Sequence, residues 1–218
     1  GIAEHLGYKN AKWIKPILDI KPKERPIKNK YVVINIHSTA QMKYWNHPDG
    51  KRVRDTSPYW NELCRILRKN GLTPVVVEKN ELWGVNPYYN GLPKKSVKRV
   101  GMPLEEVVNY IQHAEFFIGL SSGLAWIAHG LGKKTAIIAN FTNEDHEIPL
   151  DENNYKRITK KDVCHGCWNN PKYDLMSIYE DKNDTWDECP EHKGTKREFE
   201  CHTSITPEQV FNEIKDWI

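Results

Sequence analysis

Short apolar runs alternate with helix-like stretches along most of this chain. The runs at residues 30–39, 72–79, 115–119 and 134–140 are rich in β-branched or aromatic residues and read as buried strands. Residues 57–71, 103–114 and 121–132 carry helix patterns, beginning at Pro or small residues, with Gly closing the first and the last. Strands that alternate with helices predict an α/β fold with a parallel sheet built from βαβ units.

Three further segments complete the pattern. Residues 80–102 are rich in Gly, Pro, Asn and Lys and are predicted to form an irregular loop. Residues 141–201 contain few apolar runs and many Asn, Asp, Lys and Glu residues. Residues 204–218 predict an amphipathic helix that is capped by Thr206 and Pro207 and packs back on the domain. Its apolar face consists of Val210, Phe211, Ile214 and Trp217.

Composition describes an ordinary globular chain. With 218 residues and 39% hydrophobic content, it is long enough for one substantial domain, alone or with a small appendage. We expect a lead-in or linker over residues 1–30, solvated and partly extended, and one domain over residues 31–218. No apolar run is long enough to span a membrane and no secretory signal is visible, so a cytoplasmic location is expected. The net charge of +3 is too balanced to indicate nucleic-acid binding.

A turn between a strand and a helix is the most informative polar segment. Ser121, Ser122 and Gly123 follow the strand at 115–119 and open the next helix. A helix N-terminus offers unpaired N–H groups and partial positive charge, and small residues allow a phosphate to approach them. The serines could instead serve only as helix caps. No Gly-x-Ser-x-Gly motif is present, so a nucleophile elbow is excluded.

The loop after the first strand is the natural partner of this turn, because loops of this kind face one crevice in a doubly wound sheet. It supplies donors suited to a diphosphate, and its lysine could neutralise a leaving group. These donors are Ser38, Thr39 and Lys43. His37 is either a base or, more commonly for such a residue, structural. Tyr44 and Trp45 suit either stacking on a ring or core packing.

Four of the five cysteines lie in the polar segment near the C-terminus. Cys164 and Cys167 form a C-x-x-C pair, and Cys189 and Cys201 complete a four-thiolate set typical of a structural metal site. Zinc is the default ion for these ligands, and iron is accepted as well. A redox pair is disfavoured, because the C-x-x-C does not open a helix after a strand. The fifth cysteine, Cys64, falls on a helical apolar pattern and is predicted to be a buried hydrophobe.

Several ordered motifs together resemble the C-terminal part of the bacterial autotransporter heptosyltransferases. They are IHSTAQMKYWNHPDG, FFIGLSSGLAWIAHGLGKKTAII, VCHGCWNN, DECP and FECHTSITPEQV. The resemblance covers about residues 26–218. It implies a Rossmann-like, GT-B-type donor-binding domain with helices on both faces of the sheet, and a four-cysteine metal finger at about residues 160–202. It also implies distant similarity to the lipopolysaccharide heptosyltransferases.

The resemblance implies functions for particular residues. Lys43 is similar to a lysine that contacts the donor pyrophosphate and is the expected catalytic residue. Ser121, Ser122 and Gly123 resemble the turn that holds donor phosphates, and the four cysteines resemble ligands of one iron ion. An ADP-sugar is the implied donor, a hydroxyl of an autotransporter-like protein the implied acceptor, and a homo-oligomer is compatible with the family.

In such enzymes an acceptor-binding N-terminal half and an acidic catalytic base precede the region seen here. That half is expected either to be missing or to be a separate chain. Asp145 and Glu147 lie near the expected site and either hydrogen-bond the donor sugar or ribose or belong to a solvated loop. The main alternative function is a non-catalytic, metal-stabilised module for protein interaction, favoured by the eight tryptophans. A nucleic-acid-binding zinc protein is the weakest alternative.

Overall fold

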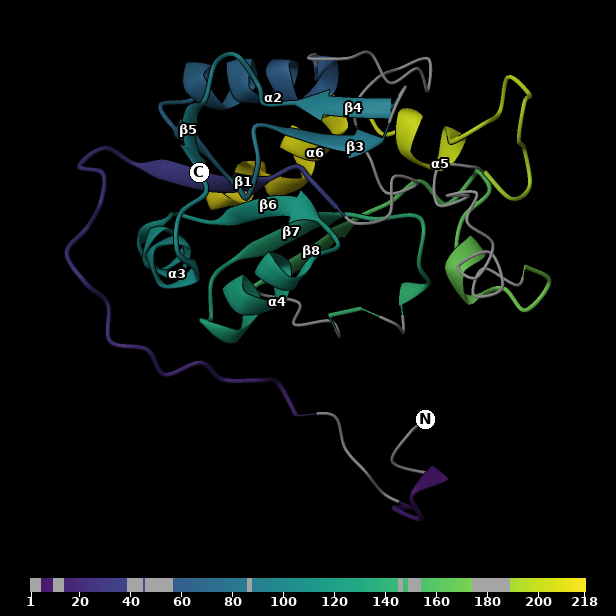
Figure 1. The fold of residues 1–218 in the computed structure, drawn as a ribbon, viewed down its shortest axis with the longest axis horizontal. Coiled ribbons are helices and arrows are strands. Elements are labelled where there is room, and N and C mark those ends of the chain that lie inside the picture. Colours follow the sequence, from purple (N-terminus) through teal and green to yellow (C-terminus); the bar gives the residue numbers. More distant parts are fainter. Residues whose placement is uncertain are drawn as a thin grey trace.

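A six-stranded parallel sheet with the order β5-β2-β1-β6-β7-β8 forms the centre of the protein (Figure 1). The structure is a computed structural model and describes residues 5–9, 14–38, 45, 57–85, 88–144, 147–148, 154–173 and 189–218. The strands of the sheet are β1 (Tyr31–Asn35), β2 (Thr73–Glu78), β5 (Val97–Val100), β6 (Phe117–Leu120), β7 (Thr135–Ile138) and β8 (Tyr155–Ile158). A separate antiparallel hairpin is formed by β3 (Leu82–Val85) and β4 (Tyr88–Gly91).

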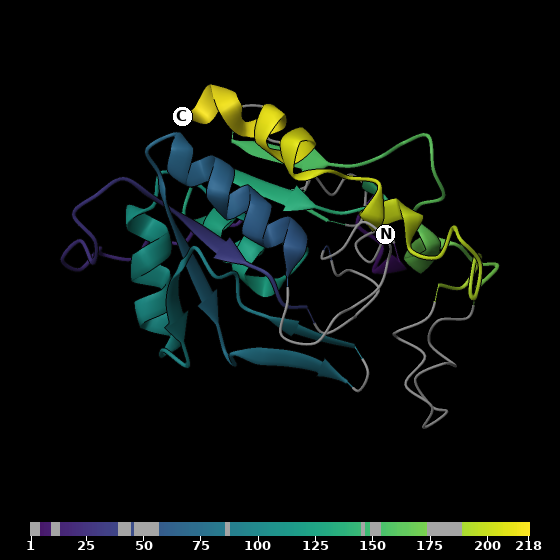
Figure 2. The same ribbon diagram turned by 90° about the horizontal axis from the view of Figure 1, so that it is seen from above.

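Helices cover both faces of the sheet, as the sequence predicts (Figures 1 and 2). On one face, α2 (Pro58–Lys69) and α6 (Pro207–Ile214) pack beside each other, and a short 3₁₀ turn, η6 (Lys215–Trp217), ends the chain. On the other face lie α3 (Leu104–His113) and α4 (Gly123–Gly130). Each face has its own buried cluster, because successive side chains of a strand point to opposite sides.

The predicted helix boundaries have clear physical causes. Pro58 and Pro207 each stand in the first helical turn, where the missing N–H is not needed. Thr206 caps α6 by accepting a hydrogen bond from the amide of Gln209 at 3.1 Å. Ser57 does not cap α2 with its side chain, since its buried hydroxyl donates to the carbonyl of Gly91 in the hairpin.

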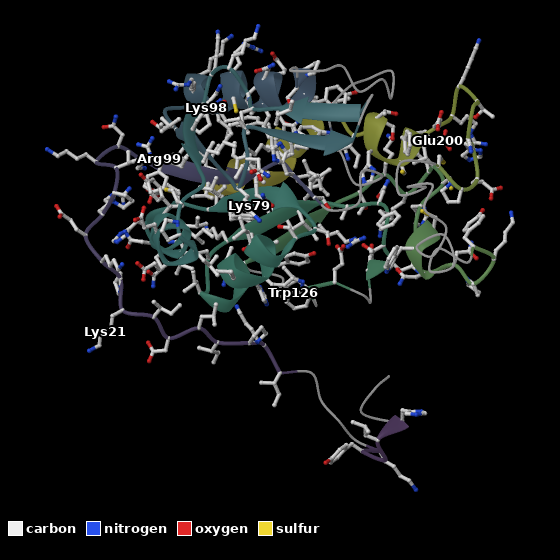
Figure 3. The ribbon with its side chains drawn as sticks, viewed as in Figure 1. Lys21, Lys79, Lys98, Arg99, Trp126 and Glu200 are labelled. Atoms are coloured by element: carbon white, nitrogen blue, oxygen red, sulfur yellow. The ribbon has the colours of Figure 1, made fainter. Side chains whose placement is uncertain are left out.

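Two strands of the sheet were not predicted. β5 lies inside the segment expected to be an irregular loop, and β8 lies inside the polar segment at 141–201. They occupy the two outer positions of the sheet. Both carry a Lys-Arg pair, at Lys98 and Arg99 (Figure 3) and at Lys156 and Arg157. Edge strands commonly carry charges, which removes the apolar run on which the prediction relied.

The described part of the expected lead-in is mostly exposed, and hydrogen bonds tie it to the helices (Figure 1). The side chain of Asn109 in α3 accepts from the amide of Lys23 at 3.1 Å and donates to the carbonyl of Glu24 at 3.0 Å. The amide of Leu18 donates to the carbonyl of Gly130 at 2.8 Å. Lys21, labelled in Figure 3, lies on this segment, outside the helical layer. The proposed boundaries between lead-in, domain and insertion stay predictions.

The cysteine-bearing segments form a small lobe beside the sheet (Figures 1 and 2). We call residues 164–173 and 189–203 the cysteine lobe; it contains the 3₁₀ turn η3 (Cys167–Asn169) and the short helix α5 (Glu200–Thr203). Its own buried cluster holds Phe141, Cys189 and Phe199, far fewer apolar residues than either face of the sheet provides. Among the described residues, none of the helices has the length and apolar character needed to cross a membrane.

Candidate functional site

The chain adds strands in one direction from β1 and in the opposite direction from β6, so the topological switch point lies between these two strands. Ligands of open α/β sheets usually bind at such a switch point. From β1 the chain proceeds outward through β2 to β5, and from β6 it proceeds the other way through β7 to β8. Asn35 at the end of β1 pairs with Gly119 in β6. The loop carrying Ser38 and the turn of Ser121 to Gly123 therefore leave neighbouring strands at the same edge, as predicted.

A buried carboxylate organises the end of β1. One oxygen of Glu78, at the end of β2, accepts from the side-chain amide of Asn35 at 2.9 Å. The same oxygen accepts from the backbone amides of Ile36 at 2.5 Å and His37 at 2.9 Å. Its other oxygen lies 3.2 Å from Nδ1 of His37, and both side chains are almost fully buried. This contact holds His37 against the end of β2, as the structural interpretation requires, and a role as a base stays a prediction.

The network continues into the serine turn. The hydroxyl of Ser122 donates to Oδ1 of Asn35 at 2.7 Å. This bond links the start of α4 to the end of β1 at the topological switch point. Ser122 thus positions the helix N-terminus, and its side chain makes no capping bond to the helix. Ser122 occupies the N-cap position, but the alternative that Ser121 or Ser122 merely caps the helix does not describe the side chain of Ser122.

The N-terminus of α4 is exposed at Gly123. The amides of Ala125 and Trp126 donate to the carbonyl of Ser122 at 3.1 and 3.4 Å. The earlier amides have no acceptor within the helix, as at every helix start. Among the described residues, a Cβ atom added to Gly123 would meet nothing within 4 Å, and Gly123 is exposed. Within that part of the chain, an anion can approach the positive end of this helix at Gly123.

Other predicted donor-site residues have different outcomes. Ser38 is nearly buried directly after His37, whereas Thr39, Lys43 and Tyr44 lie outside the described residues. Trp45 belongs to the core: it is fully buried, and its Nε1 donates to the carbonyl of Ile205 at 2.6 Å.

Of the two acidic candidates, the structure describes Glu147, whereas Asp145 lies outside the described residues. Glu147 is 6% exposed, accepts from the hydroxyl of Thr142 at 2.5 Å and forms a buried ion pair with Arg157. It is therefore not part of a solvated loop, and a contact with the donor stays a prediction.

The four predicted metal ligands line one pocket in the cysteine lobe, and all are free thiols. Within the part of the chain that the structure describes, no three His, Cys, Asp or Glu side chains stand in an arrangement that could hold a metal ion as they are. The donor set nevertheless suits a soft tetrahedral ion, because four thiols line the same pocket and the C-x-x-C pair turns through Gly166 at φ +70°. Burial, then the neighbouring Cys189 and Cys164, raises the pKa of Cys167 to about 12.

Cys164 and Cys201 respond similarly. Burial, followed by repulsion from the neighbouring thiols, raises the pKa values of Cys164 and Cys201. These thiols are therefore protonated at neutral pH, and a cation would have to displace their protons. Cys64 is fully buried in α2, and burial raises its pKa to about 12, which confirms that it acts as a core residue.

Sequence reasoning missed three residues of this edge, namely Asn35, Glu78 and Asn140. Each follows an apolar run directly, in VVIN, VVVE and AIIAN. A polar residue that ends a buried strand is the signal that could have identified them. Glu78 is followed by Lys79, which Figure 3 labels.

The chain is similar in sequence and structure to known proteins. No family model matches the chain. The chain is 35% identical to the autotransporter heptosyltransferase Aah of Escherichia coli over 193 aligned residues. This alignment covers 88% of this chain and 44% of Aah. Solved structures of TibC from Escherichia coli, an iron-containing dodecameric enzyme, superpose with TM-scores of 0.76 and 0.77 at 31% identity, over 92% of this chain and 48% of TibC. One TibC structure contains ADP-D-β-D-heptose.

A further relative is named the inactive autotransporter heptosyltransferase BimC of Burkholderia thailandensis, with 27% identity over 92% of this chain and 43% of that protein. The fold and these matches define a GT-B-type glycosyltransferase domain of the heptosyltransferase class. Within that class, the chain belongs to the autotransporter heptosyltransferase family. It spans about half the length of the curated relatives it matches.

Proposed function

We propose that this chain binds an ADP-sugar, of the ADP-heptose type, at the carboxyl ends of β1 and β6. The observation that carries the proposal is the exposed N-terminus of α4, at Gly123, beside the topological switch point between β1 and β6. The diphosphate would lie against the amides at Gly123, with Ser121 and Ser38 as further donors. The relative TibC, which is similar over nearly the whole chain, has been solved with ADP-D-β-D-heptose.

The proposed reaction is transfer of the sugar to a protein hydroxyl. The acceptor oxygen would form a bond to the anomeric carbon while the bond from that carbon to the diphosphate oxygen breaks. ADP would leave with the electron pair, and the hydroxyl proton would pass to a base. Lys43 and the α4 N-terminus would stabilise the leaving diphosphate. The base and the acceptor site are assigned to the remaining half of the family architecture, whether in one chain or a second.

Replacement of Lys43 tests the donor assignment. Lys43→Ala removes one charge from the diphosphate site and should weaken ADP-heptose binding about 10- to 100-fold, as expected for a charged hydrogen bond. Calorimetric titration with ADP and ADP-heptose provides the readout. Unchanged affinity would refute the role of Lys43, and absence of any heat with the unmodified chain would favour the protein-interaction alternative. That alternative is weakened because Trp45 and Trp60 are core residues.

We further propose that Cys164, Cys167, Cys189 and Cys201 hold one structural metal ion. Iron is the favoured ion because TibC is described as iron-containing, and the four-sulfur set accepts it. The ion would supply folding free energy to a lobe with a very small core of its own. Elemental analysis of chain purified without added metal should give about one iron per chain. Zinc at the same stoichiometry would support the site and refute the choice of ion.

The cellular setting follows from the same proposal. We place the protein in the cytoplasm, where ADP-sugars and reduced thiols coexist. Its acceptor would be an autotransporter-like protein, and a homo-oligomer is proposed because TibC is dodecameric. Light scattering of the purified protein would test the assembly.

A further inference from the structure

Asn140 lies where the cysteine lobe joins the sheet, two residues after β7. It is 2% exposed, and its side-chain amide is fully engaged. The Nδ2 group donates to the carbonyl of Cys201 at 2.8 Å and to that of Lys160 at 3.1 Å. The Oδ1 atom accepts from the amide of Lys160 at 3.1 Å. The backbone carbonyl of Asn140 accepts from the amide of Gly166 at 2.7 Å.

The residues after Asn140 extend this docking. The carbonyl of Phe141 accepts from the amide of Trp168 at 3.1 Å, and the two rings pack with centroids 5.2 Å apart. The amide of Asn143 donates to Oδ1 of Asn169 at 2.8 Å. The segment after β7 therefore fixes the C-x-x-C turn through its backbone. The side chain of Asn140 fixes the start of α5, which carries Cys201.

A four-sulfur site requires two segments that are distant in the sequence to meet at one point. Asn140 contacts both of them, because its carbonyl holds Gly166, between the first two cysteines, and its amide holds Cys201. Its side chain is not itself a metal ligand, since its donors and acceptor are committed to the backbone. We propose that Asn140 is a positioning residue that holds Cys201 within reach of Cys164 and Cys167. This inference rests on the metal site of the proposed function, not on donor binding.

Cobalt titration of the metal-free chain tests the proposal. Co²⁺ bound by thiolates gives charge-transfer bands, and tetrahedral coordination gives intense d–d bands, so that affinity and geometry are read together. Asn140→Asp keeps the size of the side chain but replaces the two donors by an oxygen that faces the carbonyls of Cys201 and Lys160. It should lower Co²⁺ affinity about 10- to 100-fold, the usual loss for residues that orient ligands, and weaken the tetrahedral bands.

The matched control is Asn170→Asp, in the same lobe. Asn170 is exposed, and its Oδ1 accepts from the nearby amide of Lys172 at 3.0 Å. This variant should retain wild-type affinity and spectrum. Equal losses in the two variants, or a wild-type spectrum and affinity in Asn140→Asp, would overturn the positioning role.

A measurement on the wild-type chain covers the case in which Asn140→Asp does not fold. With Zn²⁺ as a diamagnetic probe, the side-chain amide protons of Asn140 should gain protection from exchange when the ion binds. No gain would refute the inference. If the wild-type chain binds neither Co²⁺ nor Zn²⁺, the proposed metal site fails together with this inference, whereas binding of ADP-heptose would remain open to its own test.

Discussion

Glu78 is the residue on which the end of β1 depends. Its buried carboxylate accepts hydrogen bonds from the side chain of Asn35 and from the amides of Ile36 and His37. Buried donors that lose an acceptor cost about 1–3 kcal/mol each. Through Asn35 the same network reaches Ser122 at the start of α4. The site is therefore held in shape by side chains that end strands, while small residues leave room for a ligand.

Replacement of Glu78 should destabilise the domain. Glu78→Ala leaves the amides of Ile36 and His37 without their acceptor, so we expect a loss of about 2–4 kcal/mol in the free energy of unfolding. Glu78→Gln retains one oxygen as an acceptor and should lose less. Urea denaturation measures both values. Equal stabilities of Glu78→Ala and the wild type would show that this network does not hold β1 in place.

Gly123→Ala should separate donor binding from stability. The added methyl group meets no atom of the described residues within 4 Å, and Ala favours a helix more than Gly does. The unfolding free energy should therefore stay equal or rise slightly. The methyl group would occupy the space in front of the α4 amides and weaken ADP-heptose binding about 10-fold or more, as for one lost charged hydrogen bond. Unaltered binding in a stable variant would place the diphosphate elsewhere.

At this scale the sequence predicted residues in loops and missed those that end strands. The small residues of the serine turn are visible as a motif, because they stand between an apolar run and a helix. Glu78 is not, because the partners of its carboxylate lie on a strand that is distant in the sequence. Trp45 likewise depends on a contact with a residue that is distant in the sequence. Stacking and core packing require the same side chain, and only the contact with Ile205 distinguishes them.

Of the three buried clusters in the described residues, the one at the cysteine lobe is the smallest. The segment after β7 supplies much of the docking of this lobe. A lobe of this kind opens at lower free energy than the sheet unless a ligand holds it.

Removal of the metal should open this lobe and leave the sheet intact. After chelation of the metal-loaded chain, amides in residues 164–173 and 189–203 should lose protection from hydrogen exchange, because the ion supplies their folding free energy. Amides of β1, β6 and β7 should keep their protection, since both faces of the sheet are packed independently of the lobe. Loss of protection throughout the sheet would show that the lobe and the sheet fold as one unit.

Two glycines of the lobe form a matched pair. Gly166 and Gly194 both have φ of +70°, so alanine imposes a similar backbone cost of about 1 kcal/mol at each position. At Gly166 the new Cβ atom would lie 1.9 Å from Oδ1 of Asn143, whereas at Gly194 it would meet no described atom within 4 Å.

Gly166→Ala should therefore cost about 1 kcal/mol more than Gly194→Ala, because the side chain of Asn143 must leave its position. Hydrogen exchange of the lobe amides gives both values. The additional substitution Asn143→Ala should recover most of the difference. If the two glycine variants behave alike, the contact with Asn143 has no energetic weight.

The success of element prediction followed the apolar pattern. Central strands and the amphipathic helices were predicted because their burial leaves a strong pattern in the sequence. The edge strands β5 and β8 were missed because each has Lys-Arg at its centre. Arg99 donates to the hydroxyl of Tyr110 at 2.7 Å, and Arg157 pairs with Glu147, so tertiary contacts stabilise strands that the local sequence does not indicate.

For the whole molecule, topology determines where a ligand can bind. A doubly wound parallel sheet has a topological switch point, and in this structure it lies between β1 and β6. The fold class and the meeting of the two loops could thus be predicted from alternating elements and from resemblance to the family. The sequence also predicted that the four cysteines form one site; they do line one pocket, and the metal itself stays a prediction. The position of that pocket beside β7 could not be predicted, since it depends on Asn140 and the contacts around it.

Donor binding by this half of the family architecture is the central claim, and calorimetric titration of ADP-heptose into the unmodified chain tests it most directly. We predict one binding event per chain, competition by ADP, and a clearly lower affinity in Gly123→Ala at unchanged stability. No binding heat for either ligand, with a chain shown by circular dichroism to be folded, would contradict the account.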